Sequence, residues 1–169
     1  MKQSEFLETV LPFKDKVFRL AKRLLVSVEE AEDATQELYM KLWKNKKQIQ
    51  NYKNVEAFAM TMTKNYCFDR LKSKQASNLK LVHSNYEEKG TSLERKIELN
   101  DSVSKVHMLI NDLPEQQRMI IQLRDIEEYE FDEIAKLLNM KPTAIRVALS
   151  RARKTIKEQL IKQHNYGVS

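Results

Sequence analysis

Apolar residues recur every three or four positions along most of the chain, the spacing of amphipathic α-helices. The first such stretch spans residues 4–25 and should be divided at Pro12, because proline starts a helix well and continues it poorly. Ser27 and Glu30 have the spacing of a capping box, which predicts a second helix reaching about Asn45. Its predicted buried stripe consists of Ala31, Ala34, Leu38 and Leu42. Asn54 is predicted to cap a third helix.

This periodicity stops between residues 76 and 100, where Ser, Asn and Gly dilute the apolar residues and the opposite charges cancel. We interpret residues 76–100 as a flexible linker. Helical spacing returns from Val103 to Leu113, and Pro114 then opens another helix. The sequence therefore predicts an all-α protein with two small helical domains, residues 1–75 and 101–165, followed by a tail at 166–169.

Residues 131–154 have the pattern of a helix, a tight turn and a second helix. Asn139 tolerates the left-handed conformation that ends a helix, and Pro142 suits the first turn of the next one. The second helix is apolar on one side and basic on the other, as expected of a helix that enters a major groove. The apolar side of this second helix consists of Ile145, Ala148, Leu149, Ala152 and Ile156. Ordinary surface helices have the same pattern, so the pattern alone does not identify a DNA-binding helix.

The charge distribution favours the DNA-binding interpretation of this pair of helices. Residues 141–162 carry seven Lys or Arg against Glu158 alone, whereas residues 112–133 carry eight acidic residues against two Arg. Such segregation is expected where one helix meets a polyanion. The net charge of +6 and the pI near 9.3 also favour an acidic partner.

Residues 64–74 mix aromatic and basic side chains, a combination that suits unpaired DNA, because bases stack on rings while cations hold the backbone. A core helix with a solvated basic rim would have the same composition, so both interpretations stay open.

The composition argues against several other functions. Cys67 is the only cysteine, which excludes an internal disulfide or a thiolate zinc cluster within this chain. The three histidines are scattered without metal-ligand spacing, and no nucleophile and base converge in the sequence. We therefore expect no enzyme activity, no cofactor, no metal and no small-molecule substrate. Without a signal peptide or an apolar spanning run, we expect a cytoplasmic protein that is not inserted in a membrane.

Two separated stretches resemble one family. Ala31-Glu32-Asp33-Ala34-Thr35-Gln36-Glu37-Leu38, continuing to Leu42-Trp43, resembles region 2 of bacterial extracytoplasmic-function (ECF) sigma factors. Residues 113–118, together with Leu123-Arg124, Glu133-Ile134-Ala135 and residues 145–153, resemble region 4 of the same family. Both matches, in this order and with a tether between them, cover most of the chain.

The resemblance implies roles for the polar residues of the first domain. Those that correspond to the surface docking on core RNA polymerase are Asp33, Gln36, Glu37, Met40 and Lys41. Those that correspond to the −10 element surface are Phe58, Lys64, Asn65, Tyr66 and Arg70. Asn65 is expected in the short loop with which the family captures a flipped base.

In the second domain, the resemblance implies contact with the −35 duplex by Arg124, Thr143, Arg146, Val147, Ser150, Arg151 and Arg153. Arg146 is our choice for base-edge contact, and Arg124 and Arg153 for phosphate contact. Glu130 and Lys141-Pro142-Thr143 depart from the common family pattern. Val147 and Ser150 also differ from the family's common choices, so the −35 sequence cannot be carried over from the family.

We therefore expect a promoter-specificity subunit whose partners are core RNA polymerase, double-stranded −35 DNA, single-stranded −10 DNA and an anti-sigma factor. The alternative is a stand-alone helix-turn-helix regulator that binds an operator as a dimer. The polar face at Asp33, Gln36 and Glu37 weighs against that alternative.

Overall fold

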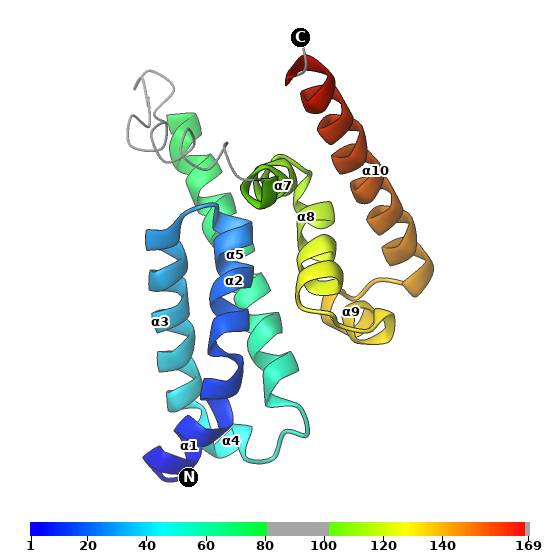
Figure 1. The fold of residues 1–169 in the computed structure, drawn as a ribbon. Coiled ribbons are helices and arrows are strands. Elements are labelled where there is room, and N and C mark those ends of the chain that lie inside the picture. Colours follow the sequence, from blue (N-terminus) through cyan, green and yellow to red (C-terminus); the bar gives the residue numbers. More distant parts are fainter. Residues whose placement is uncertain (81–101, 168–169) are drawn as a thin grey trace.

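The computed structural model describes residues 1–80 and 102–167, with side chains described for 1–75 and 102–165. Within these residues every regular element is helical, as the apolar periodicity predicted. Figure 1 shows the first group of helices beside the second, with α2 and α5 facing α8 and α9. In the described part of the chain, no helix is long and apolar enough to cross a membrane.

The first domain begins with α1 (Gln3–Val10), which is followed by a single 3₁₀ turn, η1 (Leu11–Phe13), and then α2 (Lys14–Leu25). The break lies at Pro12, as predicted. Apolar side chains from all three segments are buried, among them Phe6, Val10 and Leu20. The domain continues with α3 (Val28–Lys44), the short α4 (Lys46–Ile49) and the long α5 (Val55–Lys80).

The helix starts of this domain follow the predicted caps, with one difference. The Ser27 hydroxyl accepts a hydrogen bond from the Glu30 backbone N–H (3.3 Å), and the Asn54 side chain accepts one from Ala57 (2.9 Å). The Glu30 carboxylate, however, forms an ion pair with Lys74 on α5. The capping box is therefore half formed, because a cation on a neighbouring helix takes the carboxylate that was expected to close it.

The second domain contains α7 (Ser102–Asn111), α8 (Glu115–Ile121), the single π-helical turn η2 (Gln122–Ile126), α9 (Phe131–Leu138) and α10 (Pro142–Gly167). α9 and α10 form the predicted helix-turn-helix. Asn139 adopts the left-handed conformation (φ 53°), and α10 begins at Pro142. The predicted apolar side of α10 is buried at Ile145, Ala148, Leu149 and Ala152, and Ile156 is partly buried.

The structure shifts two predicted boundaries. Residues 76–80 belong to α5 rather than to the linker, and residues 166–167 belong to α10 rather than to a tail. Both helices continue because no proline or glycine precedes Lys80 in α5 or Gly167 in α10 within the last turns of each helix. Residues 81–100, the remainder of the predicted linker, lie outside the described residues.

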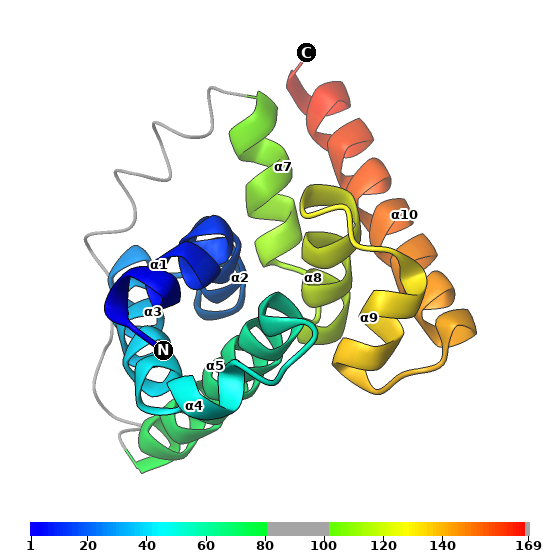
Figure 2. The ribbon, with the colours of Figure 1, turned by 90° about the horizontal axis from the view of Figure 1, so that it is seen from below.

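The two domains lie in direct contact and share one continuous apolar core. Helix α2 packs against α8 and η2, and α5 packs against α9. Figure 2 shows the same arrangement from below, with α5 beside α8 and α9. Residues more than a hundred positions apart in sequence are therefore neighbours at this interface.

Candidate nucleic-acid interface

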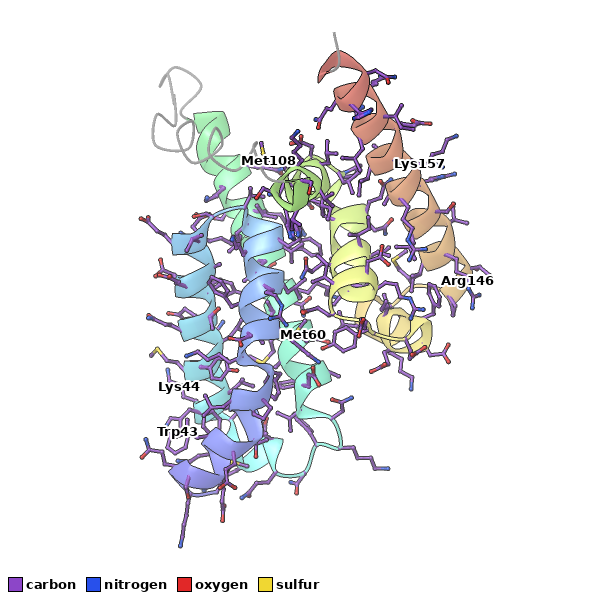
Figure 3. All side chains as sticks on the ribbon, in the orientation of Figure 1. Trp43, Lys44, Met60, Met108, Arg146 and Lys157 are labelled. Atoms are coloured by element: carbon purple, nitrogen blue, oxygen red, sulfur yellow. The ribbon has the colours of Figure 1, made fainter. Side chains whose placement is uncertain are left out.

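The basic side of α10 presents the expected −35 residues to solvent. Thr143, Arg146, Val147, Ser150, Arg151 and Arg153 are all exposed, and they follow the side of the helix opposite its buried stripe. Arg146 lies near the start of α10, at the outer end of the domain in Figure 3. Beside this face, an open hollow is bordered by Gln116, Gln117, Met140, Thr143, Ala144, Val147, Ala148 and Arg151.

Phe131, the first residue of α9, organises two of the expected DNA-binding arginines. The guanidinium carbon of Arg124 lies 4.5 Å from the centre of the Phe131 ring, and that of Arg146 lies 4.9 Å from it. Guanidinium groups are attracted to aromatic faces at these distances. The ring therefore restricts the side chain of Arg146 without using its hydrogen-bond donors, which stay available for a base edge.

Arg124 and Arg153 have partners within the second domain. Arg124 donates to the Tyr129 carbonyl oxygen (2.9 Å) and lies 3.8 Å from a Glu130 carboxylate oxygen, so it also shapes the approach to α9. Arg153 forms a two-pronged ion pair with Asp125, and the hydrogen bond raises the pKa of the guanidinium. A phosphate would compete with these carboxylates for both arginines. Among the chosen residues, Arg146 is the better prepared for DNA.

Asn65 does not lie in a loop, contrary to the expectation from the resemblance. It is exposed in the middle of α5, which continues without interruption from Val55 to Lys80. Its neighbours Lys64 and Tyr66 turn to nearly opposite sides of the helix, because residues two positions apart are separated by about 200°. The Lys64 ammonium donates to the Leu137 carbonyl oxygen of α9 (3.0 Å), whereas the Tyr66 ring faces Lys41 of α3.

The structure instead places a loop at residues 50–54, immediately before α5. Tyr52 in this loop is 40% exposed, and its ring lies 4.8 Å from that of Phe58, centre to centre. Lys53 beside it is exposed as well. Tyr52 was not among the expected −10 residues, although an aromatic residue between Asn51 and Lys53, in a break between two helical patterns, is a sequence signal for such a surface. Of the five expected −10 residues, Phe58 adjoins this loop.

Arg70 and the residues expected to bind polymerase lie on the exposed sides of α5 and α3. Arg70 is exposed and lies 3.9 Å from Glu30. On α3, the residues expected to bind polymerase are all exposed, opposite the buried stripe of Ala31, Ala34, Leu38 and Leu42; they are Asp33, Gln36, Glu37, Met40 and Lys41. The Lys41 ammonium lies 5.4 Å from the Tyr66 ring centre, so the α3 face adjoins α5.

The polar contacts between the two domains could not be read from the sequence. Arg23 of α2 is buried and donates to Gln122 and Asn111 of the second domain. Burial, together with the positive charge of Arg118, lowers the pKa of Arg23 to about 10. No local pattern around Arg23 indicates such a partner, because the contact joins residues 99 positions apart.

The described residues contain no group of three or more His, Cys, Asp or Glu side chains that could hold a metal ion. Cys67 is buried and free, and burial raises the pKa of its thiol to about 12. The available chemistry at the exposed faces is therefore cationic, aromatic and hydrogen-bonding, which suits contact with nucleic acid and protein.

Comparison with known proteins covers both domains. Residues 10–77 match the family model for sigma-70 region 2, and residues 104–156 match the model for sigma-70 region 4. The ECF RNA polymerase sigma factor SigW of Bacillus subtilis is 24% identical in an alignment 168 residues long that covers 94% of this chain and 90% of SigW.

Solved structures show the same fold. The chain is similar to the sigma factor RpoE of Bartonella quintana, crystallised with the anti-sigma factor NepR, with a TM-score of 0.75 and 18% identity over 92% of this chain and 96% of RpoE. It is also similar to CnrH in its complex with the cytosolic domain of CnrY, with a TM-score of 0.67 and 16% identity over 95% of this chain and 90% of the matched chain. Since both sigma-70 regions are present in order and together take in most of the sequence, the chain belongs to the sigma-70 family as an ECF sigma factor.

Proposed function

We propose that this sigma factor directs core RNA polymerase to promoters by dividing the work between its two domains. The first domain binds the polymerase and the unpaired −10 strand, and the second binds the −35 duplex. The observation that carries this proposal is the presence of region 2 and region 4 in one chain, each with its polar face exposed. A dimeric operator binder would not need region 2, and nothing in the comparisons supports that alternative.

We assign polymerase docking to the exposed face of α3. Asp33, Gln36 and Glu37 share this face with the exposed Met40, so polar groups surround an accessible apolar side chain. Interfaces of this composition are common between proteins, because the apolar centre supplies binding free energy and the charges supply specificity. Since α3 is anchored by a fully buried stripe, its exposed face is a rigid docking surface.

We assign capture of an unpaired −10 base to the loop at residues 50–54 rather than to Asn65. Flipping a base out of a duplex costs a few kcal/mol, and stacking on an aromatic ring recovers about 1–3 kcal/mol. The Tyr52–Phe58 pair offers such a ring, and Lys53 offers a cation for the backbone. Asn65, Tyr66 and Arg70 then follow along α5 as further strand contacts.

Two further assignments rest on the same function. The fold likeness to RpoE, whose structure contains an anti-sigma factor, supports an anti-sigma factor as a partner of this chain. We also place the protein in the cytoplasm, because that is where core RNA polymerase and promoter DNA are available to it. Phosphodiester synthesis stays with the polymerase, and the sigma factor contributes binding and strand opening.

Run-off transcription with purified core RNA polymerase and genomic promoter fragments tests the function. The wild-type chain should yield discrete transcripts that the core enzyme alone does not produce. Glu37→Lys should weaken core binding, because it reverses a charge in the middle of the docking face, while circular dichroism remains unchanged. Glu8→Lys makes the same charge change on the exposed surface of α1 and should bind core normally. Equal core affinity of the two variants would contradict the docking assignment, and an absence of specific transcripts would contradict the function itself.

A further inference from the structure

We infer that Val147 selects a thymine in the −35 duplex, by placing its side chain against the 5-methyl group of that base in the major groove. This inference rests on the proposed function and names one base that the second domain distinguishes. Val147 is 49% exposed on α10, on the side of the helix that carries the expected DNA-binding residues. Since Val147 departs from the residues common at this position in the family, the assignment does not follow from the resemblance.

Val147 borders the open hollow between α8 and α10, and the part of that hollow formed by α10 is lined by methyl groups. Thr143, Ala144, Val147 and Ala148 line it from two successive turns of the helix. Each of these side chains carries at least one methyl group, and Met140 adds a thioether from the turn before α10. An apolar strip therefore interrupts the basic side of α10.

The backbone that carries Val147 is held firmly by the core. Ile145 and Leu149, two positions before and after it, are 0% and 2% exposed, and they turn to the opposite side of α10 because two positions correspond to about 200°. The start of α10 is also connected to α8, since Gln116 Nε2 donates to Met140 Sδ (3.3 Å) at the edge of the hollow. Val147 is therefore presented to solvent by a rigid support.

The charges around Val147 favour a polyanion as the occupant of this surface. Arg146 precedes it and Arg151 lies about one turn further along, and both are exposed. No acidic residue occurs between Pro142 and Lys157. Cations on both sides of an apolar side chain bring it against DNA, because they contact the phosphates that border the groove. An apolar protein surface would lack this charge complementarity.

The chemistry of the base edges then favours thymine. In the major groove, adenine, guanine and cytosine expose hydrogen-bond donors and acceptors, whereas thymine also exposes its 5-methyl group. Covering donors and acceptors with a valine side chain removes their hydration without replacing it, which is unfavourable. Covering a methyl group buries apolar surface on both molecules, which is favourable. Val147 therefore discriminates by a gain with thymine and by a cost with the other bases.

Deoxyuridine substitution tests the contact, because deoxyuridine pairs like thymidine and lacks only the 5-methyl group. Holoenzyme formed from the full chain and core RNA polymerase is titrated with duplexes of a promoter identified by run-off transcription. Each thymine of the −35 element, on either strand, is replaced in turn. For the wild-type chain, one or two replacements should weaken binding about fourfold, the effect expected for one buried methyl group.

Three variants connect this effect to one side chain. Val147→Ala removes two carbon atoms without changing the charge, and it should bind the thymine and deoxyuridine duplexes equally well at the sensitive position. Val147→Ile keeps a large apolar side chain and should retain the preference for thymine. Ile161→Ala is the matched control, because Ile161 is 50% exposed on α10 about four turns beyond Val147 and is not among the expected DNA-binding residues. Its preference should equal that of the wild-type chain.

Cytosine methylation provides the converse experiment. Replacing the sensitive T·A pair by C·G should weaken binding of the wild-type holoenzyme. A 5-methyl group on that cytosine lies at the same place in the major groove, so it should restore about fourfold of the lost affinity. Val147→Ala should bind the methylated and unmethylated duplexes equally well.

Three results would overturn the inference. The first is a wild-type holoenzyme that is insensitive to every deoxyuridine replacement. The second is a fourfold effect that persists in Val147→Ala, because another residue would then contact the methyl group. The third is weaker binding of Val147→Ala to core polymerase without promoter, which would identify the hollow as a protein-docking site. Circular dichroism checks folding, and Val147→Thr, which removes one apolar contact, replaces the alanine variant if that variant fails to fold. If the wild-type chain produces no specific transcript, the proposed function fails instead.

Discussion

Val26 joins α2 to α3 in the left-handed backbone conformation, with φ 53° and ψ 36°. A β-branched residue adopts this conformation at a cost of about 1–2 kcal/mol, because its side chain crowds the backbone. The side chain is 45% exposed, so it recovers little of that cost by burial. Asn139 ends α9 in the same conformation with a residue type that tolerates it. The end of α2 at Val26 is therefore more strained than the end of α9 at Asn139, although both residues have the same backbone conformation.

Val26→Gly should raise the free energy of unfolding by about 1 kcal/mol, because glycine adopts the left-handed conformation without steric conflict. Urea denaturation followed by circular dichroism measures the effect. Val28→Gly is the matched control, because Val28 is 47% exposed but lies at the start of α3, where glycine weakens the helix. The control should be less stable than wild type. A less stable Val26→Gly variant would contradict the strain argument.

Cys67 should make the stability of the protein fall at alkaline pH. Burial, and secondarily the charge of Glu30, raises the pKa of its thiol from 9.0 to about 12. Above pH 9 the unfolded chain releases this proton while the folded chain keeps it, so the unfolded state is favoured as pH rises. Up to about pH 12, the free energy of unfolding should therefore lose roughly 1 kcal/mol per pH unit from this group.

Denaturation of wild type and Cys67→Ala between pH 8 and pH 11 measures this contribution. The variant should be less stable at pH 8, because it leaves a small cavity, but its stability should fall less steeply with pH. The pKa values of Tyr39 and Tyr129 are also raised by burial, and both tyrosines remain in the variant, so the difference between the two slopes isolates the thiol. Parallel curves would contradict the assignment.

At the scale of the element, α10 combines a buried stripe with the face that we propose binds DNA, and Arg146 at the start of that face lies over the ring of Phe131. A guanidinium that donates to two atoms of one base contributes about 1–3 kcal/mol to sequence discrimination. A cation that contacts phosphate weakens binding to all sequences alike when it is removed. The two kinds of contact can therefore be separated on one helix.

Arg146→Ala should relax discrimination between −35 sequences by about 1–3 kcal/mol, as measured by competition between promoter variants in transcription or binding. Lys157→Ala provides the comparison, because Lys157 lies on the same face of α10 about three turns further along (Figure 3). Its removal should reduce affinity for all promoters equally, if at all. An equal loss on all promoters for Arg146→Ala would identify Arg146 as a phosphate contact.

The elements with an uninterrupted apolar stripe could be predicted from the sequence. The stripes of α3 and α10 and the left-handed Asn139 were found because periodicity and local backbone preference determine them. The continuity of α5 was missed at Lys64-Asn65. Its buried stripe passes through Thr63, whose hydroxyl donates to the Ala59 carbonyl oxygen (2.7 Å), so a polar residue occupies a core position and conceals the period.

Some residues of the candidate site could likewise be predicted from the sequence, and others could not. Residues on exposed helical faces, such as Glu37 and Arg146, follow from periodicity together with the family resemblance. Tyr52 was not chosen for the −10 surface, because the resemblance placed base capture at Lys64-Asn65, where the polarity of the sequence changes but the backbone of α5 continues. The contacts of Arg19 and Arg23 could not be predicted, since they depend on how two domains dock rather than on the local sequence.

At the scale of the whole molecule, a shared apolar core and a buried polar network connect two domains that belong to separate sequence regions. Domains joined by small polar interfaces usually unfold independently, whereas a shared core makes unfolding cooperative. Arg23 connects the two domains most directly, because this residue of α2 donates hydrogen bonds to Asn111 of α7 and to Gln122 of η2.

Arg23→Ala should therefore separate the unfolding of the two domains in differential scanning calorimetry. The wild-type chain should melt in one transition. The variant should show two transitions, the first about 5–10 °C below that of wild type, because several charge-assisted hydrogen bonds are lost and their acceptors become hydrated when the domains part. Lys74→Ala should keep one transition, since its ion pair lies within the first domain. Two transitions in the wild-type chain would show that each domain is stable alone and that the hydrogen bonds of Arg23 only orient the domains. An unchanged single transition in Arg23→Ala would show that the apolar contacts of α2 with α8 suffice to couple the domains.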